Sequence, residues 1–221
     1  MKSFTILADE SWLRSKVPGK AERCLKQNTI AFYHEYYFGG GRYKEDYTIE
    51  NMIVTIKNNG FNSLNIVSIC KKLEDIIRKD LYELITKNIF TASPVRVCVI
   101  PRAKIDRLYV NDSTLFRKIV RNAIKDMQEY EDGTFDICRH TNTRTTHSNK
   151  QNFGGDGEMP YCGITKDTCF INNQIAGKEI LLIDDLYTKT VGIDEDAIQA
   201  LYDNGAKKVI FYSLGKTISK F

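Results

Sequence analysis

The chain has 221 residues, of which 42% are hydrophobic and 27% are charged, a balance typical of a globular protein with one well-formed core. Its net charge of +4 suits an anionic ligand but does not by itself indicate a nucleic-acid binder. No apolar run is long enough for a signal peptide or a membrane span, so we expect a cytoplasmic protein with no membrane partner.

The first third of the chain predicts a strand and two helices. Residues 29–38 are rich in aromatic and β-branched side chains and predict a strand, which a turn of three glycines follows at 39–41. A glycine run can also cradle phosphate, but after an aromatic strand a turn is the commoner structure. Helical periodicity marks residues 49–57 and 64–87.

The middle of the chain alternates between strands and helices. Residues 95–100 predict the first strand of a sheet, and the stretch 101–104 that follows this strand carries Arg102 and Lys104. A helix with an apolar face, two short strands and a long polar loop are then predicted, at residues 115–127, 135–138, 168–171 and 139–163. Such an alternation is typical of a mainly parallel sheet.

The most informative stretch is KEILLIDDLYTKTVGIDEDA, from Lys178 to Ala197. Residues 180–183 predict a buried parallel strand that ends at Asp184 and Asp185. A polar loop at 188–192 follows this acidic pair, and a helix with its C-cap at Asn204-Gly205 comes next. The two acids and the loop should therefore lie at the carboxyl end of a parallel strand, where open α/β sheets bind ligands.

These elements together predict an α/β fold with a mainly parallel central sheet of about five core strands and helices on both faces. Residues 207–214 supply the last strand of this sheet. We expect one domain over residues 1–221, in which residues 1–60 form a small N-terminal hood and residues 61–221 form the core.

The segment from Lys178 resembles the phosphoribosyl-diphosphate (PRPP) motif of type I phosphoribosyltransferases, and the chain is most similar to their ComF-like branch. The resemblance rests on ILLIDD and on NGAKKV at residues 204–209. It implies that Asp184 and Asp185 are catalytic and bind the ribose hydroxyls, since carboxylates accept hydrogen bonds from hydroxyl groups. It implies a 5′-phosphate loop made of Thr188, Lys189, Thr190, Val191 and Gly192.

Two further loops follow from the same resemblance. Pro101, Arg102, Ala103 and Lys104 occupy the place of the pyrophosphate loop. Arg139, Arg144 and His147 fall in the segment that closes over PRPP in the family. The cysteines show no C-x-x-C pair and the histidines no zinc-ligand spacing, so we expect no metal held by protein side chains alone.

The resemblance implies a protein that binds PRPP with Mg²⁺, the ion being held mainly through PRPP. It would transfer the phosphoribosyl group to a nitrogen nucleophile and release pyrophosphate, and homodimers are compatible with it. The sequence does not identify the acceptor. We expect catalysis by positioning the ribose and stabilising the departing diphosphate, because no nucleophilic side chain stands out.

The phosphate loop departs from the family order. Gly192 falls two places late, and the β-branched Val191 resists the backbone conformation that glycine adopts there. This departure favours an alternative, a non-catalytic regulator or adaptor on the same fold that senses a nucleotide or PRPP. Because the helix supplies free N–H groups whatever the loop sequence, residues 188–192 should still form an anion site.

Overall fold

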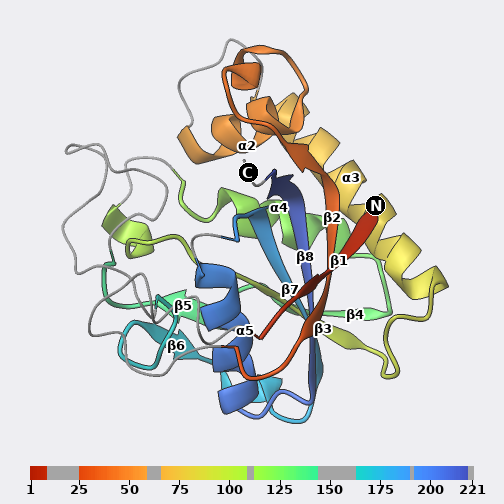
Figure 1. The fold of residues 1–221 in the computed structure, drawn as a ribbon, viewed down its shortest axis with the longest axis vertical. Coiled ribbons are helices and arrows are strands. Elements are labelled where there is room, and N and C mark those ends of the chain that lie inside the picture. The colour runs from red at the N-terminus through yellow and green to blue at the C-terminus, as the bar shows by residue number, and fades with distance from the viewer. Residues whose placement is uncertain (9–24, 59–65, 109–111, 144–162, 190–191, 219–221) are drawn as a thin grey trace.

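A six-stranded sheet forms the centre of the protein (Figure 1). The computed structural model describes residues 1–8, 25–58, 66–108, 112–143, 163–189 and 192–218. The sheet has the order β1-β2-β8-β7-β3-β4; the last five strands run parallel, and β1 pairs antiparallel with β2. The strands are β1 (Lys2–Ile6), β2 (Thr29–Tyr37), β3 (Val95–Val99), β4 (Tyr130–Gly133), β7 (Glu179–Tyr187) and β8 (Lys208–Thr217).

Helices cover both faces of this sheet, as the sequence predicts. One core cluster joins the sheet to α2 (Ile49–Asn58), α3 (Ile66–Thr86) and α4 (Leu115–Ile124). The other joins it to α5 (Ile193–Asp203) and to a small antiparallel sheet of β5 (Ile137–Arg139) and β6 (Cys169–Ile171). Three 3₁₀ turns complete the described elements, η1 (Arg42–Lys44), η2 (Asp106–Leu108) and η3 (Asn173–Ile175).

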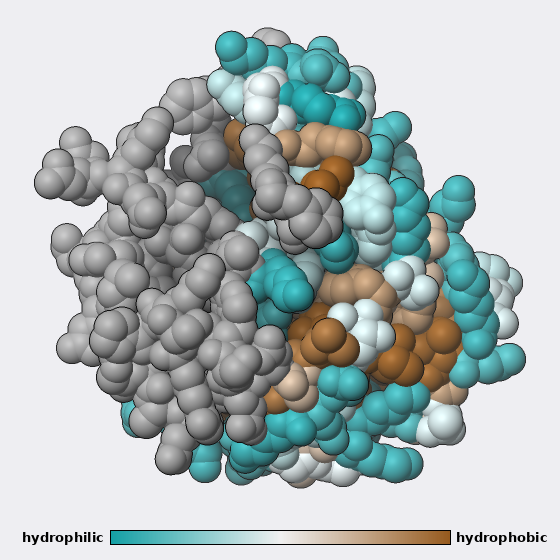
Figure 2. Space-filling view, in the orientation of Figure 1, coloured by the Kyte–Doolittle hydropathy of each residue, from teal (hydrophilic) through white to brown (hydrophobic). Residues whose placement is uncertain are grey.

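The centre of the sheet explains why the apolar run at 180–183 forms a strand. Successive side chains of a strand point to opposite faces, and this strand is covered on both. Leu181 and Ile183 belong to the cluster under α3, whereas Ile180 and Leu182 belong to the cluster under α5. Figure 2 shows hydrophobic side chains at the surface in the region of β1 and β2, between hydrophilic borders.

Residues 1–60, predicted as a small N-terminal hood, also supply two strands of the main sheet. β2 pairs in parallel with β8 inside the main sheet, and β1 adds an edge strand beyond it. The side chains of Ala31 and Phe32 are buried on opposite faces, so β2 needs cover on both sides and takes a place within the sheet. Of the elements described up to residue 58, η1 and α2 lie toward the carboxyl ends of the strands (Figure 1).

Two predicted strands belong elsewhere than expected. The segments 135–138 and 168–171 overlap β5 and β6, which pair with each other and not with the main sheet. The strand that completes the main sheet is β4, whose sequence YEDG is too polar to be recognised as a strand. β3 is the third strand in chain order, not the first, because β1 and β2 precede it.

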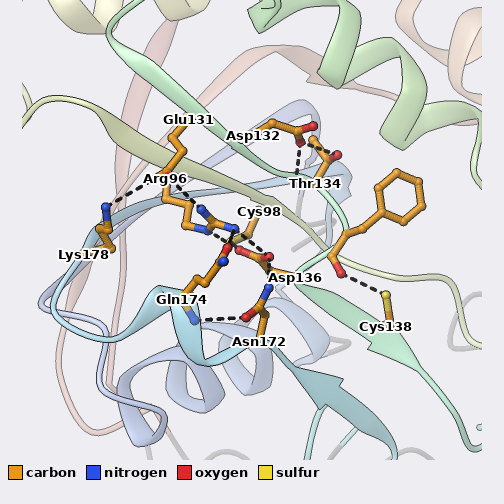
Figure 3. Close-up of polar contacts among 11 residues, drawn as sticks. Arg96, Cys98, Glu131, Asp132, Thr134, Asp136, Cys138, Asn172, Gln174 and Lys178 are labelled. Atoms are coloured by element: carbon orange, nitrogen blue, oxygen red, sulfur yellow. Dashed lines mark hydrogen bonds and ion pairs between the residues drawn. The ribbon is translucent and has the colours of Figure 1, made fainter.

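A buried ionic network ties the small sheet to the main one (Figure 3). Arg96 of β3 donates through Nε to Asp136, and its Nη2 donates to Asp136 Oδ1 at 3.0 Å and to Gln174 Oε1 at 2.7 Å. Its Nη1 pairs with Glu131 at 2.9 Å. Arg96 and Asp136 are each only 4% exposed, and Asn172 donates to the same carboxylate at 3.0 Å. The carboxylate is thus held by donors from both sheets.

Removal of the cation from this network should be costly. We predict that Arg96→Met lowers the free energy of unfolding by about 3–5 kcal/mol, because it leaves the Asp136 carboxylate buried without its counter-charge. The double variant Arg96→Met/Asp136→Leu should recover much of that loss, since no unpaired charge then remains. Urea denaturation of the three proteins measures both effects, and a loss below about 1 kcal/mol for Arg96→Met would contradict the assigned role.

Candidate functional site

The acidic pair lies inside β7 and not after its end. The parallel pairing of β3 with β7 stops at Val99 and Ile183, with one more bond from Ile100 N to Ile183 O at 3.0 Å. β7 nevertheless continues to Tyr187, because β8 continues beside it and pairs Asp184 with Ser213. The acids therefore stand where β7 has lost one neighbour, at the carboxyl edge of the sheet. The expectation that the strand ends before Asp184 is corrected, and the position of the acids at the carboxyl edge of the sheet is confirmed.

Asp185 points toward α2 and is already paired. Its Oδ1 lies 2.8 Å from Nζ of Lys57, a residue of the last turn of α2, and only 7% of Asp185 is exposed. Burial tends to lower the pKa of Lys57, but the carboxylates of Asp185 and Asp184 outweigh burial and raise it. Lys57 is therefore a fixed positive charge at this edge.

Asp184 faces a different carboxyl group, that of Asp194 in the first turn of α5. One oxygen of Asp184 accepts a hydrogen bond from the Asp185 N–H at 2.8 Å. Burial first, and the Asp185 charge second, raise the pKa of Asp184 to about 7. Burial and the neighbouring Asp184 raise the pKa of Asp194 well above its usual range. At neutral pH this pair therefore holds a proton between its two carboxyl groups.

The full burial of Asp194 makes this proton necessary. The residue has no exposed surface, and among the described residues neither of its oxygens receives a hydrogen bond. Two ionised carboxylates cannot donate to each other, so one of them must be protonated for a bond to form. A buried carboxylate without a donor or a counter-charge is costly.

The predicted pyrophosphate loop reaches the same edge from β3. Nη1 of Arg102 donates to the Lys57 carbonyl at 3.2 Å, so the guanidinium group lies at the C-terminal end of α2, where the helix dipole favours a cation. Ala103 O accepts a hydrogen bond from the Thr143 N–H at 2.8 Å, which anchors the 101–104 loop to the segment that follows β5. Pro101 is buried and Lys104 is half-buried. The structure thus brings Arg102 to the acidic pair, through Lys57.

Arg139 does not belong to a loop that closes over a ligand. It is the last residue of β5, only 7% of it is exposed, and its Nε donates to the Arg102 carbonyl at 2.6 Å. The predicted role as a closing-loop residue is therefore wrong, because the guanidinium group is buried against the backbone of the pyrophosphate loop. Arg144 and His147 lie outside the described residues.

The predicted phosphate loop is described at Thr188, Lys189 and Gly192, whereas Thr190 and Val191 lie outside the described residues. Gly192 is the N-cap of α5 with φ 76° and ψ 6°, a left-handed conformation that glycine adopts without strain. Thr188 is half-buried, and Lys189 is exposed.

The first turn of α5 carries three acids, Asp194, Glu195 and Asp196. Glu195 accepts from the Tyr187 hydroxyl, and Asp196 accepts from the Gly163 N–H, each at 2.9 Å. These carboxylates already complement the positive end of the helix dipole. The predicted anion site at this helix N-terminus would have to compete with them.

Sequence reasoning missed two residues that shape this edge, Lys57 and Asp194. Nothing in the sequence distinguishes Lys57, since a basic residue in the last turn of a helix is common. Asp194 does carry a signal: it shares the spacing i, i+3, i+4, i+7 with Ala197, Ile198 and Leu201, all of which are fully buried. A carboxylate on the buried face of a helix is rare unless it is paired, so such a residue indicates a nearby partner.

Comparisons with known proteins leave the family open: no protein-family model matches the chain, and no curated protein is similar enough in sequence to match it. Within the described residues, no three histidine, cysteine or acidic side chains are grouped so that they could hold a metal ion. The described helices include none with the length and apolar character needed to span a membrane.

The Asp184–Asp194 pair should make the stability of the ligand-free protein fall as the pH rises from about 4 to about 7. In that window the folded chain keeps protons that the unfolded chain, with ordinary aspartate pKa values near 4, has released. Asp194→Asn should flatten this slope and raise the free energy of unfolding at pH 8, measured by urea denaturation. Asp196→Asn serves as a control, because Asp196 accepts a backbone hydrogen bond. An unchanged slope in Asp194→Asn would contradict the shared proton.

Proposed function

We propose that the protein is a type I phosphoribosyltransferase-like enzyme that binds PRPP at the carboxyl edge of its sheet and transfers the phosphoribosyl group to a nitrogen nucleophile. The proposal rests on one observation: the acids of β7 and Arg102, in the loop after β3, lie at the same edge of the sheet. Lys57 joins them, through its bond to Asp185 at 2.8 Å and its carbonyl bond to Arg102 at 3.2 Å. Neighbouring parallel strands thus present hydroxyl acceptors and cations side by side.

The residues fit such a transfer chemically. The bond between C1 of the ribose and the diphosphate oxygen would break with its electron pair leaving on the diphosphate, and a C1–N bond would form as the nucleophile loses a proton. Carboxylates at this edge would hold the ribose, which aligns C1 with the nucleophile. Arg102 and Lys57 would stabilise the charge that develops on the departing diphosphate.

The resemblance also implies Mg²⁺, and the donors present fit an ion carried by the ligand. No group of three that could hold a metal ion is found among the described residues, and Asp185 is paired with Lys57, so Asp184 is the acid at the end of β7 that could contact such an ion. Mg²⁺ commonly keeps one or two carboxylates and takes its other ligands from substrate phosphates and water. When bound, it would neutralise charge on the diphosphate.

A second candidate, a non-catalytic regulator that senses PRPP or a nucleotide, is favoured by the α5 N-terminus. Three acids fill its first turn, and Gly192 takes the N-cap position with a left-handed backbone. A 5′-phosphate would meet these carboxylates where a type I enzyme would offer unopposed N–H groups. Slow or absent turnover of common purine bases is the expected consequence.

Substitution at Asp184 tests the proposed site. Asp184→Asn should weaken the binding of Mg²⁺-PRPP at least about tenfold, since a hydrogen bond to a charged group contributes roughly 1.5–3 kcal/mol. Calorimetry measures the affinity, and release of pyrophosphate in the presence of candidate bases measures transfer. Asp126→Asn is the matched control, because the side chain of Asp126 is 74% exposed and lies between the end of α4 and the start of β4, at the amino edge of the sheet.

The two measurements separate the candidates. Tight PRPP binding with pyrophosphate release supports the transferase, and tight binding without release supports the regulator. No binding of Mg²⁺-PRPP to the unmodified protein, or equal binding by Asp184→Asn, would remove the transferase and a regulator that senses PRPP at this site.

A further inference from the structure

The two edges of the main sheet are protected to different degrees. At one edge, β4 has only four residues, and two of them, Glu131 and Asp132, are acids that form ion pairs. β1 forms the other edge with the sequence KSFTI, which contains no acid, proline or glycine, and its one strand neighbour among the described residues is β2. Short strands, charges and proline are common means by which a sheet edge avoids pairing with another strand. β1 is therefore the less protected edge.

The single charged side chain of β1 is turned toward its neighbour in the sheet. Nζ of Lys2 lies 4.4 Å from the centroid of the Tyr36 ring and 5.9 Å from that of Tyr33, both on β2. Apolar side chains are exposed close by, since Leu7 is 57% and Ile30 50% exposed. Figure 2 shows hydrophobic side chains at the surface in this region of β1 and β2. Exposed apolar side chains beside an unprotected sheet edge indicate a contact with another chain.

The side chains of β1 divide between the two faces of the sheet in a symmetrical way. Phe4 and Ile6 pack in the hydrophobic cluster on the α5 side. Because successive side chains of a strand alternate, Ser3 and Thr5 point to the opposite face, where both are exposed. The strand thus has a hydroxyl residue on either side of a central aromatic residue. Such a sequence is complementary to itself when two copies run antiparallel.

We propose that β1 pairs antiparallel with β1 of a second copy of this chain, about a two-fold axis at Phe4, so that the two main sheets join into one. In this register Phe4 faces Phe4 of the second copy, and Ser3 faces Thr5. Lys2 faces Ile6, so no two like charges stand opposite each other. Aromatic pairs and hydroxyl pairs across neighbouring strands stabilise a sheet. The same patch meets itself, as a two-fold contact requires.

The strength of this contact follows from its size. Five residues of β1 take part in each copy, and the register adds Leu7 opposite Met1, which gives the exposed Leu7 an apolar neighbour. A contact this small should be weak and reversible. Analytical ultracentrifugation should therefore show the 25.4 kDa chain shifting toward twice that mass as its concentration rises from about 1 to about 200 μM.

Charge substitutions at Ser3 and Thr5 test the register. Ser3→Lys/Thr5→Lys places cations opposite each other at two positions and should weaken the dimer at least about tenfold, because like charges directly opposite destabilise paired strands. Ser3→Glu/Thr5→Lys changes the same residues but places each new carboxylate opposite a new ammonium group, so it should keep the dimer. Both native side chains are exposed, so the fold should tolerate the changes, and thermal unfolding checks this.

Asn122→Lys/Gln128→Lys is the matched control. It adds the same two cations at exposed positions in α4 and just before β4, at the other edge of the sheet. This variant should dimerise like the unmodified protein. Equal weakening of the dimer in this control would show that net charge, and not the β1 edge, governs association.

The remaining outcomes decide the inference without reference to PRPP. A chain that stays monomeric over the whole concentration range would overturn it, and would leave the edge to a strand of another protein. A dimer that Ser3→Lys/Thr5→Lys leaves intact would also overturn it, because another surface would then hold the two copies. Loss of the dimer in Ser3→Glu/Thr5→Lys would exclude the proposed register. Because the measured quantity is mass, failure of the proposed function leaves this result unchanged.

Discussion

The pairing of β7 with β8 over the whole length of β7 is the constraint on which the site depends. Both strands run on past the last bridge between β3 and β7, so β7 keeps one neighbour while it loses the other. The acids at 184–185 are thereby held by a regular strand at the carboxyl edge of the sheet. A loop in that position would be less firmly placed, because a paired strand fixes the direction of every side chain. The two acids are therefore held as firmly as the central sheet itself.

Two neighbouring aspartates on this strand meet opposite electrostatic surroundings. Asp185 lies against the ammonium group of Lys57. Asp184 lies against a second buried carboxyl group, that of Asp194, and burial raises the pKa of both. One strand thus carries an ion pair on its α2 side and a proton-sharing pair on its α5 side. Such a difference between adjacent acids is a feature of functional sites, where protonation states are set by surroundings and not by residue type.

The elements that the sequence predicted correctly are those with a clear local pattern of apolar and polar residues. The apolar run 180–183, flanked by polar residues, could only be a strand buried on both faces, and its acids had to follow at the carboxyl edge. β4 was not predicted, because YEDG has no apolar pattern and is a strand only through its pairing with β3. The side chains that contact Asp184 and Asp185 were not predicted either. Lys57 and Asp194 lie far from each other in the chain, and only the packing of α2 and α5 on opposite faces brings them to the same strand.

The small sheet explains how a segment remote from β7 still contributes to the site. The buried pair of Arg96 and Asp136 fixes the start of β5 against β3. Three residues later, Arg139 ends β5 and donates to the carbonyl of Arg102 at 2.6 Å. Arg102 in turn donates to the carbonyl of Lys57, whose ammonium group pairs with Asp185. Each link is a hydrogen bond to or from a charged group, which is stronger than a neutral one. The cations of the site are thus held in place from the β5 side, whereas the carboxyl pair of Asp184 and Asp194 lies on the α5 side of the same strand.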